Sequence, residues 1–276
     1  MKNTGLSMRN IILIPMLIVA LGLCVSPKNA QAEVKELIIG IGIDADTLNP
    51  QEQTTTLPQN MCDLIYDNLL FQDPESKLHP HLATSYETAP DGLTLTLHLR
   101  KGVKFSDGTD FNADAVKLTW DRILDPKMRV PLRFAVGMVK ECVKIDDYTV
   151  ALKLKYPFAP LAPELSMSLV SPISPAAIEK FGEDVRQNPV GAGPYVLKEW
   201  VKGDRIVMVR NENYWGEKPT VAKIIWKIVP EDATREAMLR AGPPPNPWTA
   251  RFRPKSSVIS RWISSMITIR KKPNSC

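Results

Sequence analysis

LTLTLHLRKGVKFSDGTDFNADAV, residues 93–116, carries the clearest local structure signals in the chain. Leucines at every second position of 93–99 predict a β-strand with one buried face. Asp107-Gly108 is a turn signal, because glycine reaches backbone angles that other residues rarely adopt. Asn112 then stands where a helix cap is preferred, ahead of apolar residues at helical spacing. The stretch therefore predicts a strand, a turn and a helix in close succession.

The sequence on both sides of this stretch repeats the mixture of short strands and short helices. The further strands that we expect lie at residues 37–43, 139–145, 148–154, 195–200, 206–210 and 222–229. The further helices that we expect lie at residues 61–71, at 231–241 and directly after Ser174-Pro175. Asp146-Asp147 separates two of these strands and predicts a hairpin. The fold class that follows is α+β, or mixed α/β, without internal repeats.

The first 32 residues have the pattern of a secretory signal peptide. A basic start precedes an apolar run at 11–25, which is short for a membrane span of about 20 residues. Ala30-Gln31-Ala32 offers the small residues of a cleavage site, so we expect cleavage after Ala32 and a periplasmic protein. An uncleaved anchor is one alternative. A lipoprotein attached at Cys24 is the other, and the large residue before this cysteine argues against it.

The net charge of +5 comes from the two ends of the chain. Residues 1–32 hold three basic residues, and residues 243–276 hold seven Lys/Arg, with no Asp or Glu in either segment. Residues 33–242 hold 25 basic and 30 acidic residues, so the body is mildly acidic. Because no basic stripe with interleaved aromatic residues is present, the pI near 8.9 gives no support for nucleic-acid binding.

Three groups of motifs occur in a characteristic order. They are TLNP at 47–50 with LIYDNLL at 64–70; HLA at 81–83 with LHLRKGVKFSDG at 97–108, FNADAV at 111–116 and WDR at 120–122; and NPVGAGPY at 188–195 with NENYWG at 211–216. Behind a signal-like N-terminus, this order and spacing resembles the family 5 extracellular solute-binding proteins of ABC transporters, the peptide- and nickel-binding receptors. The resemblance covers about residues 37–242.

This resemblance implies both a fold and a function. The fold would be periplasmic binding protein-like, of type II and cluster C, with residues 33–242 as the first lobe and an insert subdomain at roughly 60–185. The function would be that of the substrate-binding component of an ABC importer. Such a protein binds di- or oligopeptides, or a similar small solute, and passes them to a membrane permease and ATPase. We therefore expect a monomer with no enzyme activity, no cofactor and no metal.

Residues 243–276 do not continue this pattern. They open with PPPNP at 243–247, and a proline cluster cannot continue the preceding helix. In the family, the chain would cross into a second lobe near this point. We hypothesise that a reading-frame shift near codon 242 leaves the second lobe missing and adds an aberrant tail. A genuine short variant is the rival hypothesis. On either reading we expect the truncated receptor to bind its ligand weakly.

The resemblance also implies candidate ligand-binding residues. Thr54, Thr55 and Thr56 lie in a polar loop ahead of an expected helix, and their hydroxyls could hydrogen-bond a peptide main chain. A solvated loop is the alternative. Gly191 and Gly193 precede an expected strand, where glycines let two segments approach closely. The approaching group is either a ligand in the cleft or a neighbouring segment of the chain.

No catalytic or metal-binding constellation accompanies these residues. The chain has three histidines, and the His-Pro-His run that includes His79 and His81 has no third ligand near it. His98 lies on the solvent side of an alternating strand. The alternative functions are a secreted hydrolase, which would need a nucleophile beside a histidine, and an exported structural or adhesive domain. Cys62 and Cys142 either form a disulfide bridge after export or remain two buried thiols.

Overall fold

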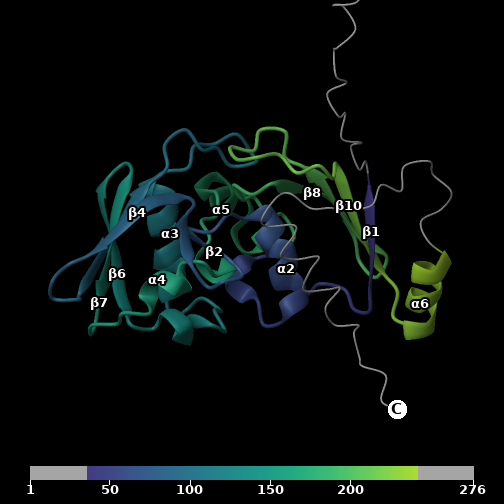
Figure 1. Cartoon of the computed structure of the whole chain (residues 1–276), viewed down its shortest axis with the longest axis horizontal. Coiled ribbons are helices and arrows are strands. Elements are labelled where there is room, and N and C mark those ends of the chain that lie inside the picture. Colours follow the sequence, from purple (N-terminus) through teal and green to yellow (C-terminus); the bar gives the residue numbers. More distant parts are fainter. Residues whose placement is uncertain (1–35, 242–276) are drawn as a thin grey trace, which may run out of the picture. The chain divides into compact units, whose positions relative to one another are not determined.

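Four strands from the beginning and the end of the described segment form one mixed sheet (Figure 1). The computed structural model describes residues 36–241. Strand β1 (Leu37–Ile41) lies at an edge and pairs in parallel with β10 (Lys223–Ile228). Strands β9 (Arg205–Arg210) and β8 (Tyr195–Val201) continue the sheet antiparallel, in the order β1-β10-β9-β8. The mixed sheet therefore joins residues that are far apart in the sequence.

A second four-stranded sheet is antiparallel throughout. Its order is β4 (Ala83–Thr88), β5 (Thr94–Leu99), β7 (Thr149–Leu154) and β6 (Val139–Asp146). Leucines at alternate positions of β5 are buried, and β6 and β7 form the hairpin across Asp146 and Asp147. Both features confirm the prediction from the sequence, because alternation with period two fixes which face of a strand is buried.

Short helices connect the strands of both sheets. The α-helices are α2 (Thr56–Ile65), α3 (Ala113–Leu124), α4 (Leu161–Glu164), α5 (Pro175–Phe181) and α6 (Asp232–Ala241). The 3₁₀ turns are η1 (Pro50–Glu52), η2 (Arg133–Val136), η3 (Ser168–Val170) and η4 (Gly182–Arg186). A small hairpin of β2 (Leu70–Gln72) and β3 (Leu78–Pro80) completes the elements.

Two helix starts form as the sequence predicts. The Asn112 side chain accepts hydrogen bonds from the backbone N–H groups of Asp114 and Ala115, which have no partner inside α3. The Ser174 hydroxyl accepts from the backbone N–H of Ala177, and Pro175 is the first residue of α5. Local chemistry thus sets where both helices begin.

The buried apolar side chains form two clusters. The first lies around the antiparallel sheet and α3, and its buried members fall within 69–170, together with Ala192. The second lies between the mixed sheet and α2, and its buried members fall within 41–66 and 173–228. The second cluster is therefore formed by two separate parts of the chain, and the segment between them forms the first cluster.

The expected helix at 61–71 is wrong at both of its ends. Helix α2 begins at Thr56 and stops at Ile65, because Tyr66 is extended at φ −116° and ψ 138°. Leu70 then enters β2, and its backbone N–H donates to the Leu165 carbonyl at 3.1 Å. An apolar run satisfies either helical or strand packing, so periodicity alone could not separate the two.

Cys62 and Cys142 are free thiols in two different clusters. The disulfide that the sequence left open is therefore absent. Burial raises the pKa of Cys142 to about 12. Burial also raises the pKa of Cys62 well above its usual range. Neither thiol is in a state that favours reaction, since the thiolate is the reactive form.

We expect both of these cysteines to resist alkylation in the folded protein. Pulse labelling with iodoacetamide at about pH 8, followed by peptide mass spectrometry, should leave them unmodified, because their thiolate populations are small and they are shielded from reagent. The same pulse in denaturing urea should label both. Labelling of either residue at similar rates in the two conditions would contradict this assignment.

Residues 36–241 contain no helix that is both long enough and apolar enough to cross a membrane. The expected signal peptide at 1–32 and the expected aberrant tail at 243–276 lie outside the described residues.

Candidate functional site

The three predicted threonines lie at the start of α2. Thr54 precedes the helix, Thr55 is its N-cap and Thr56 is its first residue, so the segment is a helix entry rather than a free loop. All three side chains are exposed, and the Thr55 hydroxyl makes no capping hydrogen bond. Within residues 36–241 none of the three hydroxyls has a hydrogen-bond partner. The helix entry therefore offers hydroxyls and first-turn N–H groups to solvent.

A buried glutamine fixes the chain just before these threonines. Gln51 is almost fully buried, and its side-chain amide donates to the Thr119 carbonyl of α3 at 2.9 Å. Arg122, also on α3, donates from Nε to the Gln51 side-chain oxygen at 3.2 Å. Both contacts come from α3, which is distant in the sequence, so this helix holds the η1 turn in place.

A capping arrangement holds the same turn from within. Asn49 accepts the backbone N–H of Gln51 at 3.1 Å, and its side-chain amide donates to Glu52 Oε1 at 2.9 Å. Arg186 donates to the same Glu52 oxygen at 3.3 Å. Sequence reasoning missed Gln51 and Glu52. A signal existed only for Glu52: the Asn-x-x-Glu spacing at 49–52 resembles a capping box.

The two predicted glycines lie at the other end of α2. A Cβ atom at Gly191 would lie 2.2 Å from the Ile65 carbonyl oxygen and 2.6 Å from the Tyr66 ring. A Cβ atom at Gly193 would lie 2.6 Å from the same oxygen, which accepts the Gly193 N–H at 2.9 Å. Both glycines are buried, and close backbone packing by itself requires glycine at these positions.

The structure does not bring the glycines and the threonines together. Helix α2 has ten residues, so about 15 Å of helix separates Thr56 from the contact between Ile65 and the glycines. A ligand contact through Gly191 or Gly193 stays a prediction. The threonines are the more accessible of the two groups.

A buried carboxylate that the sequence reasoning missed follows α2. Asp67 is 4% exposed, and its Oδ2 accepts from Trp215 Nε1 at 2.6 Å. Its Oδ1 lies 3.3 Å from the Tyr214 hydroxyl and 3.1 Å from His81 Nε2. The Arg100 guanidinium lies 4.6 Å above the Trp215 ring. Asp67 therefore organises the aromatic turn that the NENYWG motif forms.

Burial raises the pKa of the Tyr214 phenol above its usual range, and the charge of Asp67 raises this pKa further. The phenol thus stays protonated and remains a donor. His81 contacts Asp67, and His79 lies 2.6 Å from Asp73. The two histidines therefore contact different carboxylates. No cluster of three or more potential metal ligands is found within the described part of the chain. His98 is exposed on β5, 3.8 Å from Glu87.

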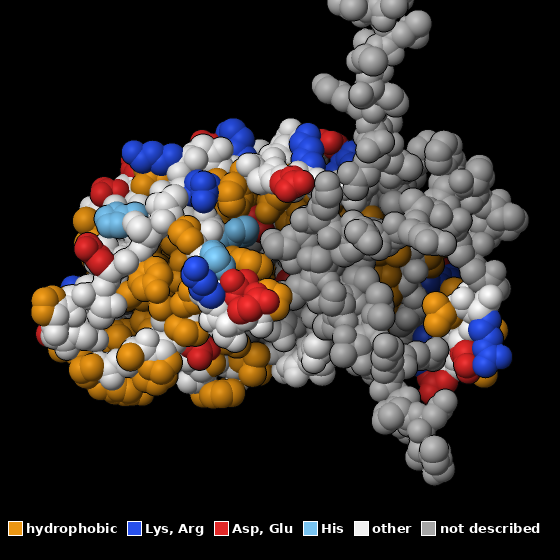
Figure 2. Space-filling model, in the orientation of Figure 1, with side chains coloured by type: hydrophobic (Ala, Val, Ile, Leu, Met, Phe, Trp, Pro, Cys, Tyr) orange, Lys and Arg blue, Asp and Glu red, His pale blue; other side chains and the backbone are white. Residues whose placement is uncertain are grey.

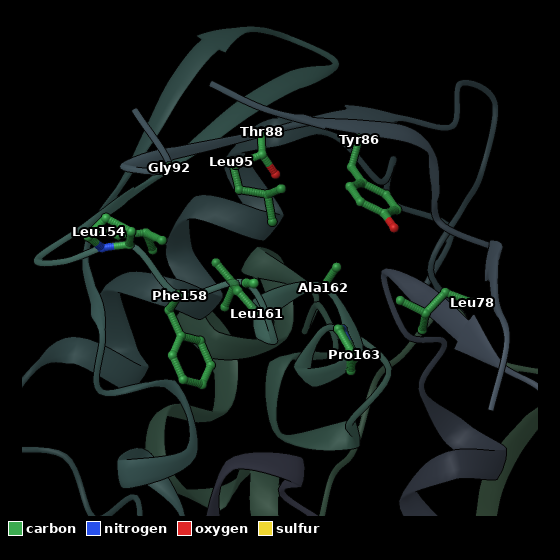
Figure 3. A pocket seen from close by; sticks show the side chains of 12 residues that line it. Leu78, Tyr86, Thr88, Gly92, Leu95, Leu154, Phe158, Leu161, Ala162 and Pro163 are labelled. Atoms are coloured by element: carbon green, nitrogen blue, oxygen red, sulfur yellow. The ribbon is translucent and has the colours of Figure 1, made fainter. Parts of the chain in front are cut away.

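A cavity of about 330 Å³ lies apart from these groups, beside the antiparallel sheet. Figure 3 shows Tyr86, Thr88 and Leu95 on the strand side, facing Leu161 and Ala162 of α4. Every lining residue is uncharged. Figure 2 shows hydrophobic side chains gathered on the face of the molecule over α4. The cavity shares no lining residue with the threonine segment.

Comparisons with known proteins agree on one family. Residues 77–243 match the family described as "Bacterial extracellular solute-binding proteins, family 5 Middle". The glutathione-binding protein GsiB of Escherichia coli O1:K1 is 38% identical over 227 residues, which is 82% of this chain and 44% of GsiB. The chain therefore spans less than half the length of this relative.

Solved structures show the same relationship. The periplasmic binding protein DppA from Helicobacter pylori, in complex with the peptide STSA, is 29% identical with a TM-score of 0.71, over 79% of this chain and 47% of DppA. The binding protein AgaA from A. tumefaciens R10, in complex with agropinic acid, is 28% identical with a TM-score of 0.71, over 75% of this chain and 42% of AgaA. These matches confirm the periplasmic binding protein-like fold and the resemblance that the sequence motifs indicate. The chain belongs to the bacterial extracellular solute-binding proteins of family 5.

Proposed function

We propose that this chain supplies the first lobe of the substrate-binding component of an ABC importer, and that the ligand is a peptide or a similar small solute. Glutathione, which GsiB binds by its name, is a tripeptide, and the similar DppA structure holds the peptide STSA. Agropinic acid in AgaA shows that this fold also accepts other solutes. Proteins of this family are transport receptors rather than enzymes, so the hydrolase alternative loses its support.

The observation that carries the proposal is the exposed segment Thr54–Thr56, which follows a turn that hydrogen bonds hold in place. Thr54, Thr55 and Thr56 present free hydroxyls beside the first turn of α2, where backbone N–H groups also lack helix partners. Carbonyl and carboxylate oxygens of a peptide are acceptors for both kinds of donor. Gln51 and Glu52 hold the preceding turn, which limits the ordering entropy that ligand binding would cost.

The wider setting follows from the same family assignment. Residues 33–242 would form the lobe, and the mature chain would begin after Ala32 in the periplasm, where DppA of this fold is located. An ABC permease and ATPase would be the partners that receive the solute. No observation within residues 36–241 favours an exported structural or adhesive domain instead.

A peptide titration followed by NMR tests this proposal. We expect glutathione or a dipeptide to shift the backbone amide signals of Thr54, Thr55 and Thr56 in fast exchange. The dissociation constant should be about millimolar, near −4 kcal/mol, since one lobe supplies only part of the contacts to a ligand. The double substitution of Thr54 and Thr55 by valine should weaken binding severalfold, because it removes two hydroxyls and keeps the side-chain shape.

Thr220→Val is the matched control, since Thr220 is also exposed and lies on the segment between β9 and β10. This substitution should leave the titration unchanged. Shifts confined to other residues would exclude the threonine site but keep the receptor function. The absence of any shift with peptides of several lengths would contradict the peptide assignment.

A further inference from the structure

The core-facing side of the antiparallel sheet is partly uncovered at its β4 edge. Tyr86 lies opposite Leu97 and Thr88 lies opposite Leu95, and residues directly opposite each other point to the same face of a sheet. Both leucines are buried in the first cluster, so Tyr86 and Thr88 also project toward the core. Tyr86 is nevertheless 42% exposed, and Thr88 is exposed as well. The space in front of these two side chains is the cavity of about 330 Å³.

The order of the strands explains why this space is left. The sheet runs β4-β5-β7-β6, and α3 packs on β6 and β7, away from β4. The wall of the cavity that faces β4 and β5 comes from α4 and from the segment 157–160 before it. Helix α4 has four residues and is therefore about 6 Å long. A helix of this length cannot fill the space along the edge of the sheet.

The wall of the cavity is rigid. Pro157, Pro160 and Pro163 recur at every third position of the wall segment, and each proline fixes its own φ angle. Gly92 closes the side next to this segment, with φ +69°, and an added Cβ atom there would lie 3.0 Å from Cβ of Pro157. Because little of the wall remains to be ordered, a ligand that enters the cavity loses little affinity to conformational entropy.

The lining disfavours charged ligands and offers two polar groups. All twelve lining residues are uncharged, and a charged group that leaves water without a partner is costly. Figure 3 shows the hydroxyl oxygens of Tyr86 and Thr88 directed toward the space in front of α4. Within residues 36–241 neither hydroxyl has a hydrogen-bond partner. A ligand that matches this lining therefore has an apolar body and one uncharged polar group.

The volume of the cavity sets the size of such a ligand. A cavity of about 150 Å³ holds one benzene molecule. The cavity beside β4, at about 330 Å³, has roughly twice that volume. Two fused rings therefore fit it better than a single ring, which would leave part of the apolar lining without contacts.

We propose that this cavity is a second ligand site, which binds a small uncharged molecule with a flat two-ring apolar body and one polar group. The rings pack among the leucines and Phe158, and the polar group hydrogen-bonds the hydroxyls of Tyr86 and Thr88. The site is independent of the proposed peptide site, because the cavity shares no residue with Thr54–Thr56.

A titration of the full exported protein with indole, followed by NMR, tests this site. Indole has two fused rings, no charge and one N–H donor. We expect it to shift the amide signals of Thr88, Ala159 and Ala162 with a dissociation constant of about 1 mM or below. The shifts that glutathione causes at Thr54–Thr56 should be unchanged by indole. No shift of the lining residues at about 5 mM indole would overturn the proposal.

A comparison with 1-methylindole tests the polar contact. This molecule lacks the N–H donor and should bind the parent protein severalfold more weakly than indole. In the double variant Tyr86→Phe and Thr88→Val the two probes should bind about equally, because no hydroxyl remains to accept the N–H. Tyr156→Phe is the control, since Tyr156 is also exposed but does not line the cavity. An unchanged preference for indole in the double variant would contradict the assigned contact.

Filling the cavity tests its location. Ala162 faces the cavity from α4, and Ala162→Phe should lower the affinity for indole at least about tenfold. Ala159→Trp should do the same from the mouth of the cavity, where the residue is exposed and a large side chain does not disturb the core. Circular dichroism shows which variants are folded. Indole binding of parental strength in a folded filled variant would overturn the assignment to this cavity.

Discussion

Gly191→Ala is expected to lower the free energy of unfolding by about 3–5 kcal/mol, more than the roughly 1–3 kcal/mol that overpacking typically costs. The added methyl group would lie 2.2 Å from the Ile65 carbonyl oxygen and 2.9 Å from its carbonyl carbon. These are backbone atoms at the end of a buried helix, so they cannot move away as the end of a flexible side chain does. The protein must separate α2 from the 188–195 segment or lose the surrounding packing.

Gly137→Ala is the matched control for this prediction. Gly137 has ordinary helical angles, φ −63° and ψ −16°, and its added methyl group would lie no nearer than 3.4 Å to any neighbouring atom. We expect a change within about 1 kcal/mol, because alanine also restricts the unfolded chain. Urea-induced unfolding followed by circular dichroism measures both variants. A loss at Gly191 no larger than that at Gly137 would show that the glycine pair is not a packing requirement.

Asp67→Ala is expected to cost about 3–5 kcal/mol, because it leaves several buried donors without an acceptor, at about 1–3 kcal/mol each. The substitution leaves Trp215 Nε1 and the Tyr214 hydroxyl without their acceptor, and it removes the partner of His81. Since buried donors without an acceptor lose their hydration with no compensation, the aromatic turn should loosen. The cost is measured by urea unfolding, and the indole N–H signal of Trp215 in NMR spectra reports the loosening of the turn, because it is resolved from those of the other five tryptophans.

Asp73→Ala provides the comparison, because Asp73 also accepts from a histidine, at 2.6 Å, but lies on the surface turn between β2 and β3. Surface pairs are screened by water, so the loss should be much smaller than at Asp67. If the two aspartates proved equally important, the buried network around Asp67 would not be what stabilises the turn. Retention of a native-like Trp215 signal in Asp67→Ala would lead to the same conclusion.

Local chemistry made much of the fold predictable. The leucine alternation of β5, the Asn112 cap of α3 and the Ser174-Pro175 start of α5 depend on residues within one or two turns of each other. The parallel pairing of β1 with β10 has no local signature, since Leu37 and Ile224 lie 187 positions apart. The extent of α2 was misjudged because its C-terminal apolar residues suit a strand equally well.

The candidate site also contains some residues that could be predicted from the sequence and others that could not. Thr54, Thr55 and Thr56 could be chosen from the sequence because a family motif points to them, and their exposure is visible in the structure. Gln51 and Asp67 could not, because their roles depend on partners brought together only by the fold. A buried polar side chain leaves no pattern in a sequence unless its partners are close along the chain.

The two-part composition of the second cluster sets an order for folding. Residues 69–170 carry nearly all of the first cluster and pair mostly with near neighbours in the sequence, so they can become structured early. Strand β1 cannot take its place until residues 223–228 have been synthesised and have reached it, which requires closing a loop of nearly the whole described chain. During that interval the apolar LIIGI segment has no partner strand, and this is the period in which the chain is most exposed to aggregation.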